Sequence, residues 1–437
     1  MDKKIVVIGA GHGGLYAARL LAEAGNDVTV FEKSPRDKVS HNRTDCIESK
    51  LLKEVDIELP EGSYKAAACS FFFPYSEKPL LIDIPEDSRD IVVERGDFVR
   101  SLADSAEKAG AKVLWETPVD SLIIDNIIIK GIVVNGEKIY ADLVIDSSGV
   151  NSPFRASLPS ILGITAKPKR EEVFNIRHAY YERAEGFEEQ PERDYIWKLY
   201  LKYMCKNSIC WVNCELPGQA GTLVGKIGDF EENESDEILE QLKKDNPIIG
   251  EKLIRGDDYA TIPLRYTSPV FVAEGYCLIG DAAFMSVPLT GCGMANAIRA
   301  AKILSEEIIR AGNTDADTLV KYQYKFFKKI GAFMCLVDCF KRALLDAEPV
   351  ELRYLAESGA VTSEDIVAIL SGDTSSVNAK EILSRLKKFP KARKTFGTVF
   401  GAVGKGAAAL AIAENPPKKY DLVELNRFRR KLDSIFN

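Results

Sequence analysis

Three glycines near the N-terminus have the spacing of a loop that binds phosphate groups. Gly9, Gly11 and Gly14 follow a short β-branched apolar run, residues 4–8, and precede residues 15–24, which have helical spacing. Gly9 permits a tight turn, Gly11 lets the backbone approach a pyrophosphate at the helix N-terminus, and Gly14 lets helix and strand pack closely. The pattern therefore predicts a buried strand, a phosphate-binding turn and a helix in direct succession.

An acidic residue follows the second predicted strand. Residues 27–31 form another apolar run, and Glu32 comes directly after it. A carboxylate at this point can accept hydrogen bonds from the ribose hydroxyls of a dinucleotide. The complete order of strand, loop, helix, strand and acid occurs once in the chain, so we expect one tightly held nucleotide cofactor and a transient electron donor.

Two further motifs place glycines and an aspartate after predicted strands. Residues 146–155 (DSSGVNSPFR) follow the apolar run 143–145, and residues 280–293 (GDAAFMSVPLTGCG) precede a predicted helix. An aspartate at a strand end can bind a ribityl hydroxyl. A glycine-rich turn that opens a helix can present N–H groups to the pyrimidine end of a flavin.

The order of the three motifs resembles the FAD-dependent superfamily of p-hydroxybenzoate hydroxylase, the flavin halogenases and the geranylgeranyl reductases, over about residues 1–310. The resemblance implies that FAD occupies the first site. It implies that Gly280 and Asp281 contact the ribityl chain, and that Arg95 lies near the cofactor, although an ordinary ion pair explains Arg95 equally well. The cofactor-binding residues assigned in this way are Gly9, Gly11, His12, Gly13, Gly14, Glu32, Lys33, Arg43, Cys46, Arg95, Gly149, Gly280, Asp281, Pro288, Gly291, Gly293 and Met294.

Within this superfamily the chain is most similar to the geranylgeranyl reductases, the FixC-like branch. Ile262-Pro263 has the spacing of that branch ahead of Gly280, and a helix predicted to be capped by Ser235 is followed by Asn246-Pro247. The strand–turn–strand around Trp211 resembles the Tyr-x-Trp-x-Phe-Pro segment of these reductases. Trp211 is kept, but the tyrosine and the Phe-Pro pair are replaced here, which changes the wall of the pocket that faces the flavin.

The resemblance implies hydride transfer from reduced flavin to a carbon–carbon double bond of an isoprenoid or other hydrophobic substrate. The electron donor would be NAD(P)H or a ferredoxin-like protein. An FAD-dependent aromatic monooxygenase that uses NAD(P)H and oxygen is the alternative, and the helical segment beyond residue 312 favours the reductase. A non-catalytic electron carrier is a third possibility.

Cys46, Cys292 and Trp211 are the candidate catalytic residues. Cys46 lies in the segment that reaches the flavin ring in this family, and Cys292 lies in the glycine-rich turn at the other edge of the ring. We expect both thiols near the flavin, where they would form a redox-sensitive pair; two buried structural cysteines are an equally good interpretation. His12 is expected to face solvent beside the cofactor, and His178 to lie in the core. The histidine and cysteine spacing predicts no metal site.

The predicted fold class is α/β (α+β). We expect a Rossmann-like FAD-binding domain of the glutathione reductase type with an inserted antiparallel β-sheet substrate domain and a C-terminal helical extension. The predicted FAD-binding domain comprises residues 1–65, 90–165 and 270–312. Residues 66–89 and 166–269 form the predicted substrate domain, and residues 313–437 the helical extension.

The net charge of −7 is unevenly distributed, because residues 380–437 contain 14 Lys and Arg against 5 Asp and Glu. The acidic remainder excludes nucleic acid as the main partner. A basic segment beside the apolar stretch 395–413 can contact an anionic membrane surface, and a helical cap on the acidic body explains it equally well. With nine cysteines in no disulfide pattern and no secretory signal, we expect a cytoplasmic protein, peripheral to the membrane if the basic segment binds lipid.

Overall fold

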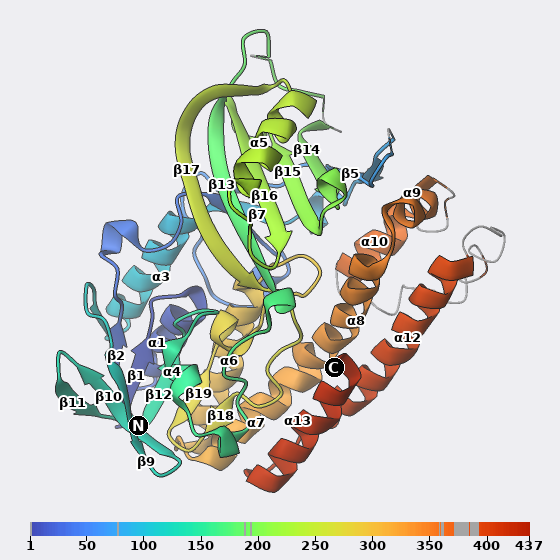
Figure 1. The fold of residues 1–437 in the computed structure, drawn as a ribbon. Coiled ribbons are helices and arrows are strands. Elements are labelled where there is room, and N and C mark those ends of the chain that lie inside the picture. Colours follow the sequence, from blue (N-terminus) through green and yellow to red (C-terminus); the bar gives the residue numbers. More distant parts are fainter. Residues whose placement is uncertain are drawn as a thin grey trace.

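The computed structural model describes residues 2–370, 384 and 393–437, apart from residues 77, 188, 193–194, 358 and 360–361. A mixed α/β body contains the N-terminus, a large antiparallel sheet stands above it, and a group of long helices runs along one side of both (Figure 1). Residues 380–383 and 385–392, which belong to the predicted basic segment, lie outside the described residues.

The first body is built on a six-stranded sheet in the order β18-β19-β12-β1-β2-β8. All neighbouring strands are parallel except β18 and β19. The apolar runs seen in the sequence become its central strands because both faces are covered. Helices α1, α3 and α6 pack side by side as one layer, and strand β10 (Ile128–Val134) of a separate sheet contacts β12. The elements are β1 (Lys4–Ile8), α1 (His12–Glu23), β2 (Asp27–Phe31), α3 (Arg95–Lys108), β8 (Lys112–Leu114), β12 (Leu143–Asp146), β18 (Val272–Ala273), β19 (Tyr276–Leu278) and α6 (Met294–Ala311).

Two three-stranded sheets flank this body, in the orders β11-β10-β9 and β3-β7-β4. The second one carries Cys46 on β3 and leads directly into α3 through Arg95. The elements are β3 (Thr44–Ile47), α2 (Leu51–Glu54), β4 (Tyr64–Lys65), β7 (Ile91–Glu94), β9 (Ser121–Asp125), β10 (Ile128–Val134), β11 (Glu137–Tyr140) and α4 (Pro153–Ser157).

A seven-stranded sheet in the order β17-β13-β16-β15-β14-β5-β6 forms the upper body, and every neighbouring pair except β14 and β5 is antiparallel. Helix α5 covers one face of it (Figure 1). This helix begins at Glu234 after Asn233, not at a Ser235 cap as the sequence predicts, because Asn233 takes the left-handed conformation that starts the turn. The elements are β5 (Cys69–Phe72), β6 (Leu80–Ile82), β13 (Val173–Arg183), β14 (Trp197–Leu201), β15 (Ser208–Asn213), β16 (Gln219–Ile227), α5 (Glu234–Asp245) and β17 (Ile249–Pro263).

The C-terminal part of the chain is helical, as predicted. Helices α8 and α12 pack along each other, and a π-helical turn, Phe327–Gly331, separates α7 from α8 within the run that the sequence predicts as continuous helix. In the described part of the chain, none of the helices has both the length and the hydropathy that crossing a bilayer requires. The elements are α7 (Ala316–Phe326), α8 (Ala332–Asp346), α9 (Pro349–Glu357), α10 (Ser363–Leu370), α12 (Arg393–Ala413) and α13 (Leu422–Phe436).

A buried network of charges attaches α8 to the segment that follows β17. Asp338 is completely buried and pairs with Lys341 at 2.6 Å, while its second oxygen accepts a hydrogen bond from the Tyr266 amide at 3.2 Å. Lys341 also donates to the carbonyl oxygen of Leu264. Arg342 extends the network to the buried Glu172 at 3.1 Å. The helical extension is therefore joined to the upper sheet by ionised groups that, except for the partly exposed Arg342, are buried.

Removing Asp338 tests this attachment. We expect Asp338→Ala to lower the free energy of unfolding by about 3–5 kcal/mol, because Lys341 is left buried without its carboxylate. Denaturant unfolding measures the loss. Glu424→Ala is the control, because Glu424 and Arg427 form an exposed pair on α13 that contributes about 0–1 kcal/mol. Equal losses in the two variants would contradict the buried network.

The same network predicts a pH dependence. Burial tends to raise the pKa of Asp338, but Lys341 and Arg342 outweigh it and lower that pKa below its ordinary value. The contribution of a carboxyl group with a lowered pKa is complete above its unfolded pKa, about 3.9, and is lost as the pH falls through the folded value. The stability difference between wild type and Asp338→Ala should therefore persist from neutral pH to about pH 4 and narrow below it.

Candidate active site

The predicted phosphate loop lies against the turn after β12. Gly9 has a φ of +93°, and a Cβ atom built on it would lie 2.8 Å from the carbonyl oxygen of Ser147. A Cβ on Gly14 would lie 2.8 Å from both Ser147 Oγ and the Gly9 carbonyl oxygen. The two turns therefore touch only because both residues are glycine. Ser147 is a residue that the sequence reasoning missed, although it lies within the second motif.

The acidic residue after β2 lies directly beside this loop. Glu32 is buried, and its two carboxylate oxygens accept hydrogen bonds from the amides of Ala10 and Ser34, each at 2.8 Å. These bonds fix the carboxylate next to the loop backbone. Lys33, the next residue, is exposed.

The two aspartates of the later motifs differ in what they bind. Asp146 is completely buried, and its carboxylate accepts hydrogen bonds from the side chains of Ser148, Ser152 and Tyr276. It therefore braces the turn and is not accessible to a ribityl hydroxyl. Asp281 is only half-buried and accepts a hydrogen bond from Ser286 Oγ at 2.7 Å. Burial raises the pKa of Asp281.

A charged cluster lies between β3 and the start of α3. Arg95 pairs with Asp45 and donates through Nε to Ser40 Oγ at 3.0 Å, and Arg43 Nη2 lies 4.0 Å from Asp45. Burial would raise the pKa of Asp45, but Arg95 and Arg43 outweigh it and lower that pKa. Arg95 thus forms the ion pair that the sequence analysis considered, within the site rather than on an open surface.

His12 is the first residue of α1 and is buried, so the expectation that it faces solvent is wrong. Its ring packs against Phe98 with centroids 5.5 Å apart, and burial lowers its pKa to about 3, with a smaller contribution from Arg95. The buried atoms His12 Nε2 and Arg43 Nη1 have no hydrogen-bond partner among the described residues. Buried polar atoms nearly always have partners, so these two fit a bound ligand with hydrogen-bonding groups.

The two candidate cysteines lie in the same part of the molecule. Cys46 is on β3 and Cys292 is in the turn before α6, and both thiols are free. Burial raises the pKa of Cys46 well above its ordinary value, with contributions from Asp45, Asp90 and the Cys292 sulfur. Cys292 is an exposed residue, while crowding around its thiol raises its pKa. Both side chains are therefore protonated thiols at neutral pH.

An aromatic row lies on the sheet face opposite α5. Alternation along the strands places Tyr181 and Val212 against α5, and His178 and Trp211 on the other face. The His178 ring lies 4.8 Å from the Tyr180 ring and 4.8 Å from the Trp211 ring, and Trp197 lies 5.0 Å beyond Trp211.

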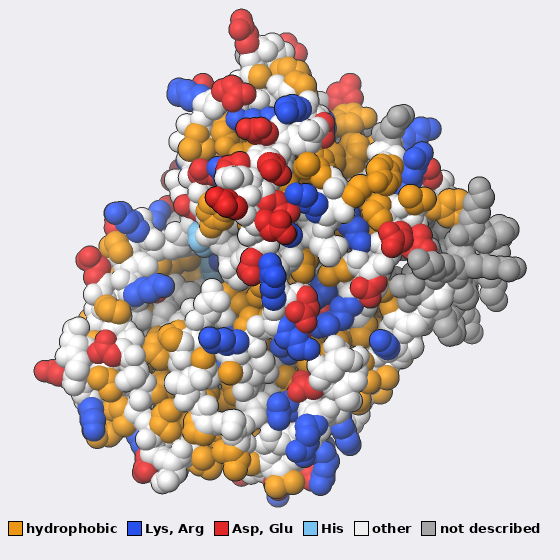
Figure 2. All heavy atoms as spheres, in the orientation of Figure 1, with side chains coloured by type: hydrophobic (Ala, Val, Ile, Leu, Met, Phe, Trp, Pro, Cys, Tyr) orange, Lys and Arg blue, Asp and Glu red, His pale blue; other side chains and the backbone are white. Residues whose placement is uncertain are grey.

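This face is joined to the loop region at two points. The hydroxyl of Tyr180 bonds to the amide of Thr44 on β3 at 2.9 Å. A Cβ on Gly291 would lie 3.5 Å from Ile262 and 3.7 Å from Leu264 at the end of β17. Figure 2 shows the hollow between the upper sheet and the lower body. The sheet that carries the aromatic row is thus joined to β3, which carries Cys46, and to the turn that carries Cys292.

Comparison with known proteins agrees with this geometry. A model of the FAD binding domain matches residues 2–182, and a model of squalene epoxidase matches residues 236–372. The chain is 25% identical over 400 residues to digeranylgeranylglycerophospholipid reductase 2 of Methanopyrus kandleri, covering 88% of this chain and 97% of that protein. It is 28% identical over 381 residues to the digeranylgeranylglycerophospholipid reductase of Methanosarcina acetivorans, covering 81% and 88%.

A solved structure has the same fold. The geranylgeranyl bacteriochlorophyll reductase-like protein of Thermoplasma acidophilum superposes with a TM-score of 0.73 at 22% identity, over 89% of this chain and 99% of that one. The predicted fold class and the predicted cofactor, FAD, are confirmed. The chain is an FAD-dependent oxidoreductase related to the geranylgeranyl reductases.

Proposed function

We propose that the protein saturates carbon–carbon double bonds in the isoprenoid chain of a lipid, using reduced FAD. The observation that carries the proposal is the match to digeranylgeranylglycerophospholipid reductases over nearly the whole length of both chains. The structure supports it with an apolar and aromatic sheet face that meets the glycine-rich turn at Gly291. A long prenyl chain needs such a surface because it has no charge to bind.

We assign the ADP portion of FAD to the loop at residues 9–14, with Glu32 at the ribose, and the flavin portion to the space bordered by Asp281 and the turn before α6. The loop fits a pyrophosphate because its glycines expose backbone amides at the N-terminus of α1. The unpaired nitrogens of His12 and Arg43 supply further donors beside it. In this assignment Asp146 only supports its turn, and so does the buried Arg155, which donates to the carbonyl oxygens of Val150 and Ala282.

When bound and reduced, FAD supplies a hydride to one carbon of the double bond. The chain's own residues position the substrate and keep water out. Ile209, Trp211 and Ile262 pack around a buried cluster on the sheet face opposite α5, and Ile262 lies beside Gly291. This packing holds an extended chain against the flavin side of the sheet, where a correctly oriented reactant reacts faster.

The second hydrogen must arrive as a proton, and Cys46 is the candidate donor. Its raised pKa keeps the thiol protonated at neutral pH. The same property disfavours the redox-sensitive pair with Cys292, because disulfide exchange proceeds through a thiolate. That pairing remains a hypothesis.

The aromatic monooxygenase is the second candidate. Residues 236–372 match a model of squalene epoxidase, so the activity assay must also measure oxygen consumption. The sequence contains one dinucleotide-binding loop, which we assign to FAD. The electron donor, NAD(P)H or a ferredoxin-like protein, would therefore bind only transiently.

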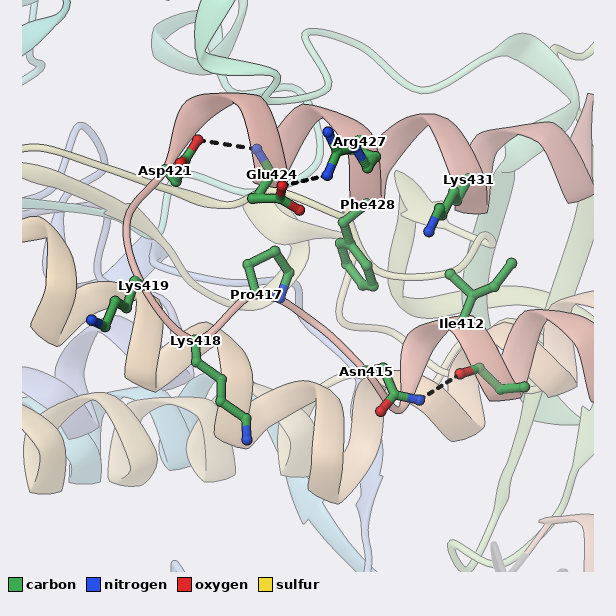
Figure 3. Close-up of a pocket in the computed structure, with 11 residues that line it drawn as sticks. Ile412, Asn415, Pro417, Lys418, Lys419, Asp421, Glu424, Arg427, Phe428 and Lys431 are labelled. Atoms are coloured by element: carbon green, nitrogen blue, oxygen red, sulfur yellow. Dashed lines mark hydrogen bonds and ion pairs between the residues drawn. The ribbon is translucent and has the colours of Figure 1, made fainter.

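A groove between α12 and α13 supports contact with an anionic lipid surface (Figure 3). Its volume is about 640 Å³, and Ile412, Pro417 and Phe428 form its apolar floor. The side chains of Lys418, Lys419, Arg427 and Lys431 surround it, and two carboxylates there are already engaged: Asp421 caps α13 and Glu424 pairs with Arg427. Among the described residues, Lys419 and Lys431 have no carboxylate at ion-pair distance.

The location of FAD is tested by Gly14→Ala. The added Cβ would collide with Ser147 Oγ and the Gly9 carbonyl oxygen, so we expect the purified variant to contain less than about a tenth of the wild-type flavin. Absorbance at the flavin band against protein concentration measures it. Gly404→Ala on α12 is the control, because no atom lies within 4 Å of the added Cβ, and it should retain full flavin. Full flavin in Gly14→Ala would place the cofactor elsewhere.

Reductase activity is tested with the FAD-loaded enzyme, reduced anaerobically and mixed with a geranylgeranyl lipid. Mass spectrometry should show gain of H2 at each saturated double bond, and the flavin should be reoxidised only by the unsaturated lipid. Oxygen consumption with a hydroxylated or epoxidised product, and no saturation, would support the monooxygenase instead. Reoxidation without any product would support an electron carrier.

Proton donation is tested by Cys46→Ala in the same assay. We expect the rate of saturation to fall about 10²-fold or more, because positioned acids contribute that much, with the flavin still reduced by dithionite. Cys205→Ala is the control, because Cys205 is exposed at the far end of the upper sheet beside Tyr75. An unchanged rate in Cys46→Ala would exclude Cys46 as the donor.

Lipid contact is tested with the double variant Lys419→Glu/Lys431→Glu in cosedimentation with vesicles containing anionic lipid. Each basic residue near a headgroup contributes about 1 kcal/mol, so binding should weaken about 30-fold or more. Lys130→Glu/Lys138→Glu, exposed on β10 and β11, makes the same charge change elsewhere. Equal binding by the two double variants would rule the groove out as the contact.

A further inference from the structure

A buried histidine on the upper sheet has no use in the scheme above. His178 lies on β13 and is only 2% exposed, yet neither Nδ1 nor Nε2 has a hydrogen-bond partner among the described residues. Buried polar atoms in folded proteins nearly always find a partner, and leaving one unpaired destabilises the fold. An imidazole with both nitrogens unpaired therefore indicates a ligand.

Two polar groups on the same sheet face as His178 are already paired. The Tyr180 hydroxyl bonds to the amide and the side chain of Thr44 at 2.9 and 2.8 Å. Asn213 accepts a hydrogen bond from the Glu215 amide at 2.7 Å. Besides His178, the buried nitrogen of this aromatic row without a partner is Trp197 Nε1, beyond Trp211. His178 is thus the residue of this row in which two buried nitrogens lack a partner within the described part of the chain.

The position of His178 is close to the proposed reaction centre. Leu223 is the register partner of both His178 and Trp211, so the two rings stand in one row across the sheet. Burial, followed by the charge of Arg43, lowers the pKa of His178 well below its ordinary value. The ring is neutral at physiological pH, and it offers one N–H donor and one acceptor nitrogen.

We propose that His178 binds a substrate oxygen attached beside the reacting double bond, as in an allylic alcohol or an allylic ether. The inference rests on the proposed function and narrows its substrate class. A prenyl chain is otherwise hydrocarbon, and its first double bond is the one that lies next to the oxygen of the head group. A hydrocarbon at this point would leave both nitrogens unpaired, whereas an oxygen accepts the N–H and sets the register of the chain along Trp211.

The test compares two ligands with the oxidised, FAD-loaded enzyme. Geranylgeraniol carries an allylic hydroxyl, and the tetraprenyl hydrocarbon of the same length carries none. Binding is followed by the change in flavin absorbance as each compound is titrated in detergent. In His178→Phe the ring is kept and both nitrogens are removed. Tyr181→Phe is the matched control, on the same strand but packed on the α5 side.

We expect His178→Phe to weaken binding of geranylgeraniol about tenfold, the loss of roughly one hydrogen bond, and to change hydrocarbon binding less than about twofold. Its melting temperature should equal or exceed that of the wild type, because an unpaired buried group has been removed. Tyr181→Phe should bind both compounds as the wild type does. His178→Leu removes the same nitrogens and serves for the titration if the phenylalanine variant loses its flavin.

Three results would overturn the inference. Equal weakening of both ligands would show that His178 acts through packing alone. Unchanged binding of geranylgeraniol would show that no hydrogen bond forms. A shift in the flavin spectrum or reduction potential of His178→Phe without ligand would show that the histidine faces the cofactor. Failure of the wild type to bind either compound would instead overturn the proposed function.

Discussion

The nucleotide-binding half of the site depends on the backbone contact between the turn after β1 and the turn after β12. Gly9 and Gly14 approach Ser147 so closely that neither position has room for a side chain. The adjacent Gly13 approaches α6 in the same way, since a Cβ atom built on it would lie 2.8 Å from the carbonyl oxygen of Ala297. Three segments far apart in the chain therefore converge on one loop. The direction of α1, the place of Glu32 and the start of α6 all follow from this contact, and so does the space that remains for a pyrophosphate.

The site's other wall depends on a different kind of interaction. The end of β17 brings Ile262 and Leu264 to the glycine-rich turn, and the carbonyl of Leu264 is held by Lys341 from α8. Asp338 and Glu172 neutralise the cations involved. The helical extension is thus joined to the wall on which the proposed substrate lies. A buried network of this kind contributes specific geometry even where its net contribution to stability is small.

Burial also sets the chemistry of the titratable groups. His12 and His178 are held neutral, and Cys46 is held as a thiol, in each case chiefly because the charged form is poorly solvated. These groups hydrogen-bond and hold protons rather than act as nucleophiles. Such a set suits a reduction in which flavin provides the electrons and the protein provides position and a proton.

The sequence by itself determined the nucleotide-binding half of the site. The spacing of Gly9, Gly11 and Gly14, followed by Glu32, is informative because the strand, the turn and the helix are contiguous in the chain. The relative positions of these residues in space therefore follow from their spacing in the sequence. The order of the later motifs extended this to the fold class and to FAD. Local patterns also placed the helices after residue 294, apart from the π-helical turn at Phe327–Gly331.

Only the tertiary structure decided which site residues are buried and which hydrogen-bond partners they have. Both Asp146 and Asp281 follow predicted strands, but Tyr276, distant in the sequence, donates to the buried Asp146, whereas among the described residues the half-buried Asp281 is bound only by the nearby Ser286 side chain. His12 follows a glycine loop and looks exposed in sequence, yet α3 covers it. His178 becomes notable only because no partner reaches it. Burial and hydrogen-bond pairing depend on contacts between segments hundreds of residues apart, and no local pattern in the sequence records them.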